Sequence, residues 1–195
     1  MEKRNVLLGI TGSIAAYKAC SLINLLKKDN LEIKAIMTSS ACKLIAPETI
    51  RSLTYNPVYI KTFNANEKKE IEHISLAKWC DLLAIVPATG NIIGKIANGI
   101  ADDLLSTVVM ALPQATPVVV APAMNTNMWL NESVQRNVKT LKKENIKVKN
   151  DTLPKYTFVG PKKGRLACED IGEGVLAEID KISKKIKELL KIVGD

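Results

Sequence analysis

The amino-acid sequence predicts an α/β protein with one doubly wound, Rossmann-like parallel sheet and helices on both faces of that sheet. Short apolar runs of strand type alternate along the chain with longer segments of helical periodicity. Two of these runs, 81–86 and 117–121, are almost entirely apolar, as are strands that helices cover on both faces. The 195 residues are enough for one such domain with a self-sufficient core.

The first half of the chain contains the first βαβ unit. Val6–Ile10 is a short apolar run of strand type. From Ile14 to Lys28, apolar residues recur every three or four positions, which is the spacing of an amphipathic helix. Leu31–Met37 alternates between apolar and polar residues, as a half-buried strand does. The remaining segments are a helix over 47–53, an irregular polar stretch over 54–72 and a helix over 74–80.

The second half repeats this alternation. The apolar run Asp81–Val86 predicts a buried strand that ends at Pro87. Asp102 is expected to be the N-cap of a helix, because its carboxylate can accept the free N–H groups of a first turn. The remaining segments are helices over 90–99, 102–112 and 131–145, strands over 117–121 and 146–149, a glycine-punctuated loop over 164–174 and a closing helix over 175–192.

The charge balance favours an anionic partner without identifying it. Lys and Arg exceed Asp and Glu by 28 to 20, which gives a formal net charge of +8. Much of the excess lies in two Lys-rich stretches, 139–149 and 181–191, which we expect to be solvated helix faces. Aromatic residues make up 4% of the chain and no recognised nucleic-acid-binding motif is present, so we expect no nucleic-acid partner.

Membrane, secreted and metal-binding classes are also disfavoured. No apolar run approaches the ~20 residues that span a bilayer. The apolar stretch after Asn5 is too short for a signal peptide, so we expect a cytoplasmic protein with no membrane partner. The four cysteines are widely separated and there is one histidine, a composition that excludes a zinc finger and argues against a disulfide framework.

The ends of the expected strands contain the unusual residues of the chain, and doubly wound sheets bind ligands there. After the first strand, Gly12 permits close backbone approach, and Ser13 opens a helix whose free N–H groups can bind an anion. The pattern G-x-x-G-S is not the dinucleotide fingerprint G-x-G-x-x-G. The second strand ends in Thr38, Ser39 and Ser40, whose hydroxyls suit a phosphate better than a ribose diol. These features favour a mononucleotide or flavin phosphate over a simple tight turn.

Other candidate groups follow later strands or stand alone. Small residues over 87–91 leave room for a flat ring, and two Met, two Asn and a Trp crowd into 122–129. Cys168 lies in the glycine-punctuated loop, which could close a site. His73 is the only histidine. Each of these four features also has a plain structural interpretation. Residues 87–91 fit a strand-to-helix turn and residues 122–129 fit a helix cap. Cys168 fits an inert thiol and His73 an exposed imidazole.

Together, these segments resemble one family, the homo-oligomeric flavin-containing cysteine decarboxylases. The match runs from about residue 5 to residue 180, with the motifs in the family's order and spacing. The motifs that carry the resemblance are Gly12-Ser13-Ile14-Ala15-Ala16-Tyr17-Lys18, His73-Ile74-Ser75-Leu76, Pro122-Ala123-Met124-Asn125-x-x-Met128-Trp129 and Leu166-Ala167-Cys168. The Pro-Ala-Met-Asn-x-x-Met-Trp segment is specific, whereas the first glycine turn alone is not.

The resemblance implies that the chain binds FMN. The residues implied near the cofactor phosphate are Gly12, Ser13, Ile14, Thr38 and Ser40, and those implied against the ring are Thr89, Gly90, Asn91, Ile92 and Met124. The resemblance also implies catalytic roles for three residues: His73 as acid/base, Asn125 as ligand of the substrate carboxylate and Cys168 as proton donor from a flexible clamp. The implied substrate contacts are Asn125, Arg165, Leu166, Ala167 and Lys78.

The implied reaction is decarboxylation of 4′-phosphopantothenoylcysteine to 4′-phosphopantetheine in coenzyme A biosynthesis. An aliphatic cysteine carboxylate cannot lose carbon dioxide directly, and transient flavin-dependent oxidation of the thiol to a thioaldehyde removes this obstacle. The enethiol is then reduced again, which requires a proton from Cys168. The resemblance further implies a homo-oligomer, a trimer or a multiple of trimers, with its site at a subunit interface. We expect residues 1–195 to form one flavin-binding domain without a fused synthetase, and a separate phosphopantothenate–cysteine ligase is one candidate partner.

Four other interpretations remain open. A peptidyl-cysteine decarboxylase would release the enethiol, and Cys168 argues against it. A flavin prenyltransferase shares the fold but fits the His73 and Pro-Ala-Met-Asn segments poorly. A non-catalytic regulatory subunit would carry long acidic extensions, which this sequence lacks. A nucleic-acid-binding module would rest on the net charge alone, and a colourless protein that shifts DNA would favour it.

Overall fold

The computed structural model describes residues 4–62, 72–148, 151–167 and 169–194. Its centre is a six-stranded sheet in the order β3-β2-β1-β4-β5-β8, and every neighbouring pair of strands is parallel. The strands are β1 (Asn5–Ile10), β2 (Glu32–Met37), β3 (Val58–Tyr59), β4 (Leu82–Ala88), β5 (Val118–Pro122) and β8 (Tyr156–Phe158). The predicted doubly wound parallel sheet is confirmed.

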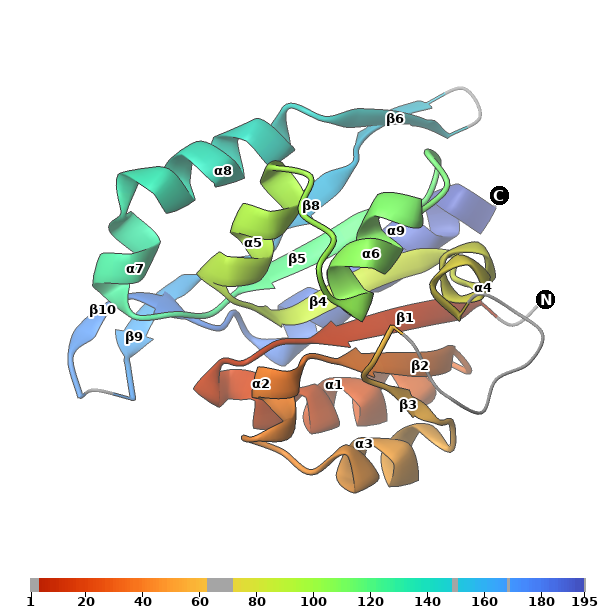
Figure 1. Ribbon diagram of the computed structural model, residues 1–195, viewed down its shortest axis with the longest axis horizontal. Helices are drawn as coiled ribbons and strands as arrows, with labels where there is room; N and C mark the ends of the chain where they lie inside the picture. The colour runs from red at the N-terminus through yellow and green to blue at the C-terminus, as the bar shows by residue number, and fades with distance from the viewer. Residues whose placement is uncertain (1–3, 63–71, 149–150, 168, 195) are drawn as a thin grey trace.

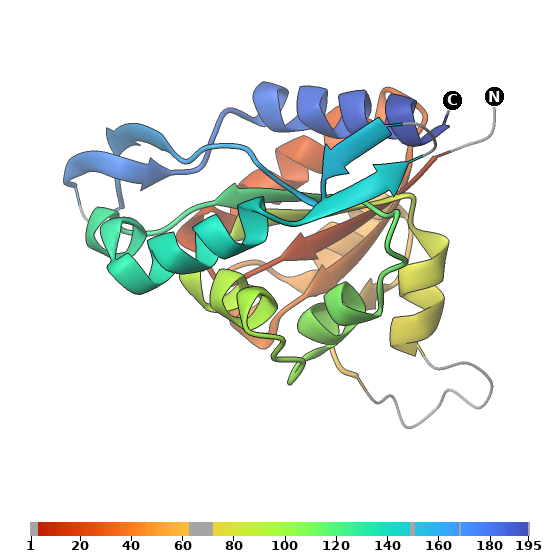
Figure 2. The ribbon, with the colours of Figure 1, turned by 90° about the horizontal axis from the view of Figure 1, so that it is seen from above.

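Helices cover both faces of the sheet (Figures 1 and 2). Because successive strand residues point to opposite faces, β1 sends Val6 and Leu8 into one hydrophobic core and Leu7 into the other. The first core is covered by the 3₁₀ turn η1 (Ile14–Tyr17), α1 (Lys18–Lys27), α3 (Pro47–Thr54) and α9 (Ile179–Gly194). The second is covered by α4 (Glu72–Trp79), α5 (Gly90–Ala97), α6 (Leu104–Ala111) and α8 (Glu132–Lys142).

Short elements extend beyond the two ends of the sheet. At the carboxyl ends of the strands lie α2 (Ser39–Cys42), α7 (Thr126–Leu130) and the antiparallel hairpin of β9 (Lys162–Arg165) and β10 (Ile171–Val175). A second hairpin, β6 (Asn145–Val148) with β7 (Asp151–Pro154), lies toward the opposite end (Figure 1). Among the described residues, no helix combines the length and apolar character needed to cross a bilayer.

The structure corrects three local predictions. The segment predicted as a loop over 164–174 belongs to the β9–β10 hairpin, so the closing helix begins at Ile179 rather than at residue 175. The N-cap of α6 is Asp103, not Asp102. The Asp103 carboxylate accepts the Ser106 N–H at 2.8 Å, and Asp102 pairs with Lys95 instead. The stretch after residue 54, which the sequence predicts to be irregular, contains the edge strand β3. This strand has two residues, which are too few to show hydrophobic periodicity in the sequence.

Candidate active site

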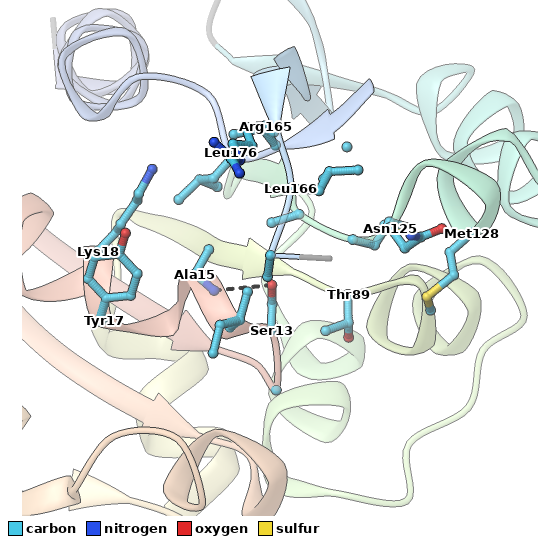
Figure 3. A pocket seen from close by; sticks show the side chains of 17 residues that line it. Ser13, Ala15, Tyr17, Lys18, Thr89, Asn125, Met128, Arg165, Leu166 and Leu176 are labelled. Carbon is cyan, nitrogen blue, oxygen red and sulfur yellow. Dashed lines mark hydrogen bonds between the residues drawn. The ribbon is translucent and has the colours of Figure 1, made fainter. Parts of the chain in front are cut away.

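A cavity of about 600 Å³ opens at the carboxyl ends of the parallel strands. The strand order reverses between β1 and β4, and doubly wound sheets bind ligands in the crevice that this reversal creates. The cavity wall is formed by the turn after β1, the turn after β4, the segment after β5 and the β9–β10 hairpin (Figure 3). The cavity therefore lies at the strand ends, where the sequence analysis predicts a ligand site.

The ends of β1 and β4 are tied together by the buried hydroxyl of Thr11. Its Oγ1 donates to the Pro87 carbonyl at 2.7 Å and accepts the Thr89 N–H at 3.1 Å. Gly12 follows Thr11, and a Cβ at that position would lie 2.4 Å from the Ser40 Cβ. Only glycine allows this turn to approach α2 so closely, and the approach brings the two predicted phosphate-binding segments side by side.

Three predicted hydroxyl groups act as helix caps. Ser13 Oγ accepts the Ala15 N–H at 3.4 Å, Thr38 Oγ1 accepts the Ala41 N–H at 3.3 Å and Thr89 Oγ1 accepts the Ile92 N–H at 3.4 Å. Ser13 and Thr89 line the cavity, whereas Thr38 is not among its lining residues. The caps fix these hydroxyls at the strand ends and leave their remaining hydrogen-bonding capacity for a ligand.

Asn125 stands at the start of α7, on the wall opposite η1. Its side-chain oxygen accepts the Asn127 N–H at 2.8 Å, so the amide is held in one orientation by a capping interaction. The neighbouring Met124 and Met128 also line the cavity and give this wall an apolar surface. The wall thus combines an amide with apolar side chains.

The β9–β10 hairpin reaches the cavity through two glycines. A Cβ on Gly174 would lie 2.1 Å from the Met124 carbonyl oxygen, and a Cβ on Gly172 would lie 2.2 Å from Thr126 Oγ1. Gly174 also has φ +137°, which side chains disfavour. Its carbonyl accepts the Met124 N–H at 3.0 Å. These close contacts dock the hairpin on the segment after β5.

Nine of the predicted site residues line the one cavity: Gly12, Ser13, Ile14, Thr89, Met124, Asn125, Arg165, Leu166 and Ala167. Five predicted cofactor contacts do not line it: Thr38, Ser40, Gly90, Asn91 and Ile92. Ser40 packs against Gly12 and Gly90 lies near Met124, so both adjoin the wall. Ile92 is 1% exposed because the first turn of α5 directs it into the core, and Asn91 is exposed.

Within one chain, two predicted residues, His73 and Lys78, are not brought to the cavity. His73 and Lys78 lie on α4, which packs at the end of the sheet opposite α7 and the β9–β10 hairpin (Figures 1 and 2). The His73 side chain is half-buried and that of Lys78 is exposed. Cys168 lies outside the described residues, directly after Ala167 in the sequence.

The structure adds lining residues to which the sequence analysis gave no role: Ala15, Tyr17, Lys18, Ala123, Met128, Gly174, Val175 and Leu176. Tyr17 and Lys18 belong to the first motif, at the transition from η1 to α1. Their position, one helical turn beyond the strand-end glycine, is the sequence signal that identifies them. Val175 and Leu176 had no such signal, because a hairpin contact between distant segments brings them to the cavity.

The lining residues fit a phosphorylated aromatic ligand such as FMN. Gly12 allows the close turn at the strand end, and the Ser13 and Thr89 hydroxyls supply polar contacts. Among the described residues, no Asp or Glu lines the cavity, so no carboxylate there would repel a phosphate. Methionine and leucine side chains provide the apolar surface that a flat ring requires.

The same family emerges from comparison with known sequences. A family model described as Flavoprotein matches residues 1–191. The chain is 42% identical over 184 residues to the coenzyme A biosynthesis bifunctional protein CoaBC of Bacillus subtilis, a match that covers 94% of this chain and 42% of that protein. It is 40% identical over 187 residues to the probable phosphopantothenoylcysteine decarboxylase of Streptococcus mutans, covering 96% and 99% respectively. The chain therefore spans about two fifths of the bifunctional relative and nearly all of the second.

Two solved structures share the fold over most of their length. One is a cysteine-to-serine variant of PPC decarboxylase complexed with pantothenoylaminoethenethiol. Its TM-score is 0.81 at 30% identity, covering 97% of this chain and 100% of that one. The other is the FMN binding protein AtHal3, with a TM-score of 0.78 at 30% identity, covering 97% and 98%.

Proposed function

The chain belongs to the flavoprotein family, and on that premise we propose that it is an FMN-dependent decarboxylase that converts 4′-phosphopantothenoylcysteine into 4′-phosphopantetheine in coenzyme A biosynthesis. The observation that carries the proposal is the cavity at the β1–β4 switch point. It combines a glycine turn, capped hydroxyls and the Asn125 amide, with no acidic side chain among its described lining residues. The relatives named above support the same reaction.

Each part of the cavity has a task in this reaction. The N–H groups at the turn after β1 and the Ser13 hydroxyl hold the cofactor phosphate. Thr89 and Met124 contact the flavin ring. Bound FMN supplies the transient two-electron oxidation that makes carbon dioxide loss feasible. Because the Asn125 side-chain oxygen accepts a backbone N–H, its amide nitrogen is oriented to donate to the substrate carboxylate.

The acid/base residue comes from a second copy of the chain in this proposal. His73 and Lys78 lie on α4, away from the cavity of their own chain, so a homo-oligomer is needed to bring them to it. Ile14, Tyr17 and Met128 are apolar cavity residues with 63%, 61% and 53% of their surface exposed, which is typical of a contact face. We propose a trimer or a multiple of trimers, in which His73 of one subunit moves a proton and Lys78 contacts an anionic group.

Cys168 completes the cycle in this proposal. It follows Arg165, Leu166 and Ala167, which line the cavity, and its thiol donates the proton that the reduced product requires. A chain without this thiol would release the enethiol instead of the saturated product. In this proposal, Cys168 is the one residue that distinguishes this protein from a peptidyl-cysteine decarboxylase.

Mass spectrometry of the product tests the proposal. The FMN-loaded protein is incubated with 4′-phosphopantothenoylcysteine. Loss of carbon dioxide with formation of 4′-phosphopantetheine is the expected result, and a Cys168→Ser variant is expected to accumulate a product two mass units lighter. Release of the lighter enethiol by the unaltered protein would contradict the role of Cys168. No turnover by a yellow, flavin-loaded protein would contradict the substrate assignment.

A further inference from the structure

The cavity contains two cations that the proposed chemistry at the carboxylate does not use. Lys18 and Arg165 both line it, and no described lining residue is acidic. Lys18 is the first residue of α1, which continues the 3₁₀ turn η1 without a break, and the first turns of both contain no acidic residue. Neither helix therefore supplies Lys18 with an ion-pair partner. A ligand that carries negative charge would supply one.

The acidic residues near this pair are engaged elsewhere or only weakly bound. Glu178 forms an ion pair with Lys162, and the hydrogen bond from Lys162 is the largest cause that lowers the Glu178 pKa, with a smaller contribution from Lys18. Arg165 lies 3.8 Å from Glu169, but both side chains are largely exposed. An exposed pair of this kind contributes little, so a multiply charged anion can displace it. This end of the cavity therefore keeps a positive potential.

Lys18 and the Asn125 amide occupy opposite sides of the cavity. Figure 3 shows Lys18 on the left, Asn125 with Met128 on the right, and Arg165 between them, above Ser13. In 4′-phosphopantothenoylcysteine, the carboxylate and the phosphate are at opposite ends of an extended molecule. When Asn125 holds the carboxylate, the far end of that molecule extends toward the cations.

We propose that Lys18, assisted by Arg165, binds the phosphate of the substrate and makes the enzyme select phosphorylated over unphosphorylated pantothenoylcysteine. This inference rests on the proposed function and adds a specificity-determining residue to it. The chemistry recognised is a phosphate monoester dianion, which could belong to the substrate or to FMN. The test below distinguishes these two sources.

The test measures binding, so that it does not depend on turnover. Dissociation constants of 4′-phosphopantetheine and of pantetheine are measured by calorimetry on the FMN-loaded protein. The unaltered protein is expected to bind the phosphorylated compound more tightly. Lys18→Gln is expected to weaken that binding roughly 10- to 100-fold and to change pantetheine binding less than about twofold, because only a charge-assisted hydrogen bond is lost. Lys184→Gln, which removes the same charge from the exposed face of α9, is the matched control and is expected to change neither constant.

Three other results would overturn the inference. Equal affinities of the unaltered protein for the two compounds would remove the phosphate preference, and an equal loss for both compounds in Lys18→Gln would indicate a general structural role. Release of FMN from Lys18→Gln on dilution, followed by flavin fluorescence, would assign the lysine to the cofactor phosphate. A protein that prefers 4′-phosphopantetheine through Lys18 but does not decarboxylate the substrate would overturn the proposed function and leave this inference standing.

Discussion

The two ends of the sheet differ in how far hydrogen bonds within the chain satisfy their polar groups. At the amino end, the buried ammonium of Lys155 donates to the carbonyls of Pro113, Gln114 and Thr116 at 3.0, 3.2 and 2.7 Å. At the carboxyl end, the Ser13 and Thr89 hydroxyls accept single capping bonds and face a cavity. One end satisfies its polar groups within the chain, and the other keeps capacity for a ligand.

From this difference we expect the amino end of the sheet to contribute mainly to stability and the carboxyl end mainly to function. Changes at the amino end leave carbonyl groups unpaired in the interior, so they are expected to lower the free energy of unfolding. Changes at the carboxyl end remove contacts that are completed only when a ligand binds, so they are expected to change activity more than stability. The predictions below test this separation.

The largest expected effect is on stability. Lys155→Met keeps the apolar stem and removes the donor of three carbonyls, so it is expected to lower the free energy of unfolding by about 3 kcal/mol and the melting temperature by roughly 6–12 °C. Urea unfolding at fixed protein concentration measures this change. Lys184→Met on the exposed face of α9 is the control, with a change of less than about 0.5 kcal/mol. Equal losses in the two variants would contradict the proposed importance of the buried ammonium.

The second prediction concerns the hairpin that closes the cavity. Gly174→Ala places a Cβ against the Met124 carbonyl at a residue with φ +137°, so the hairpin cannot dock and Arg165 leaves the wall. We expect kcat/KM to fall roughly 30-fold or more, which corresponds to about 2 kcal/mol. Gly164→Ala in β9 is the matched control, because its Cβ would meet only Val175 at an ordinary distance of 3.5 Å. Similar activity of the two variants would show that docking is not needed.

The same hairpin shows what the sequence can and cannot predict. Glycine at 172 and 174 is typical of a loop when only neighbours in sequence are considered, and a loop is the prediction made here. In the structure, these glycines are strand residues that permit contact with Thr126 and Met124, about 50 residues earlier in the chain. Such a contact depends on tertiary packing, which local periodicity does not encode.

The residues at the strand ends could be predicted from the sequence, whereas the distances between helices and strands could not. Ser13, Thr38 and Thr89 lie within three residues of the ends of apolar runs, and all three prove to cap helices at the carboxyl edge of the sheet. His73 has equally clear chemistry, but its separation from the cavity depends on which end of the sheet α4 covers. The sequence predicts which residues have reactive side chains, and the topology determines which of these side chains lie close together within one chain.

A third prediction separates capping from substrate binding at Asn125. Asn125→Asp retains an oxygen that accepts the Asn127 N–H, so the free energy of unfolding is expected to change by less than about 0.5 kcal/mol. The new carboxylate would repel that of the substrate, and KM is expected to rise roughly tenfold. Steady-state kinetics with 4′-phosphopantothenoylcysteine measures this change. An unaltered KM would remove Asn125 from carboxylate recognition, and a large loss of stability would make the residue mainly structural.

The smallest expected effect is a pair of opposite pH dependences at the amino end. Burial lowers the pKa of Lys155 to about 8, below its usual 10.5, so the unfolded chain binds more protons above pH 8 and this group makes stability rise with pH. Burial raises the pKa of the nearby Cys80 thiol from 9.0 to about 12, so above pH 9 the folded chain keeps a proton that the unfolded chain loses, and stability falls. Between pH 9 and 10 the two contributions oppose each other, each by up to about 1.4 kcal/mol per pH unit.

Variants at these two positions separate the contributions. Relative to the unaltered protein, Lys155→Met is expected to make the slope of unfolding free energy against pH more negative, and Cys80→Ala is expected to make it more positive. Urea unfolding at pH 9.0, 9.5 and 10.0 measures the slopes, each compared with that of the unaltered protein. Parallel slopes in all three proteins would show that neither group titrates differently in the folded and unfolded states. The contribution of the amino end to stability would then be independent of the ionisation of Lys155 and Cys80 between pH 9 and 10.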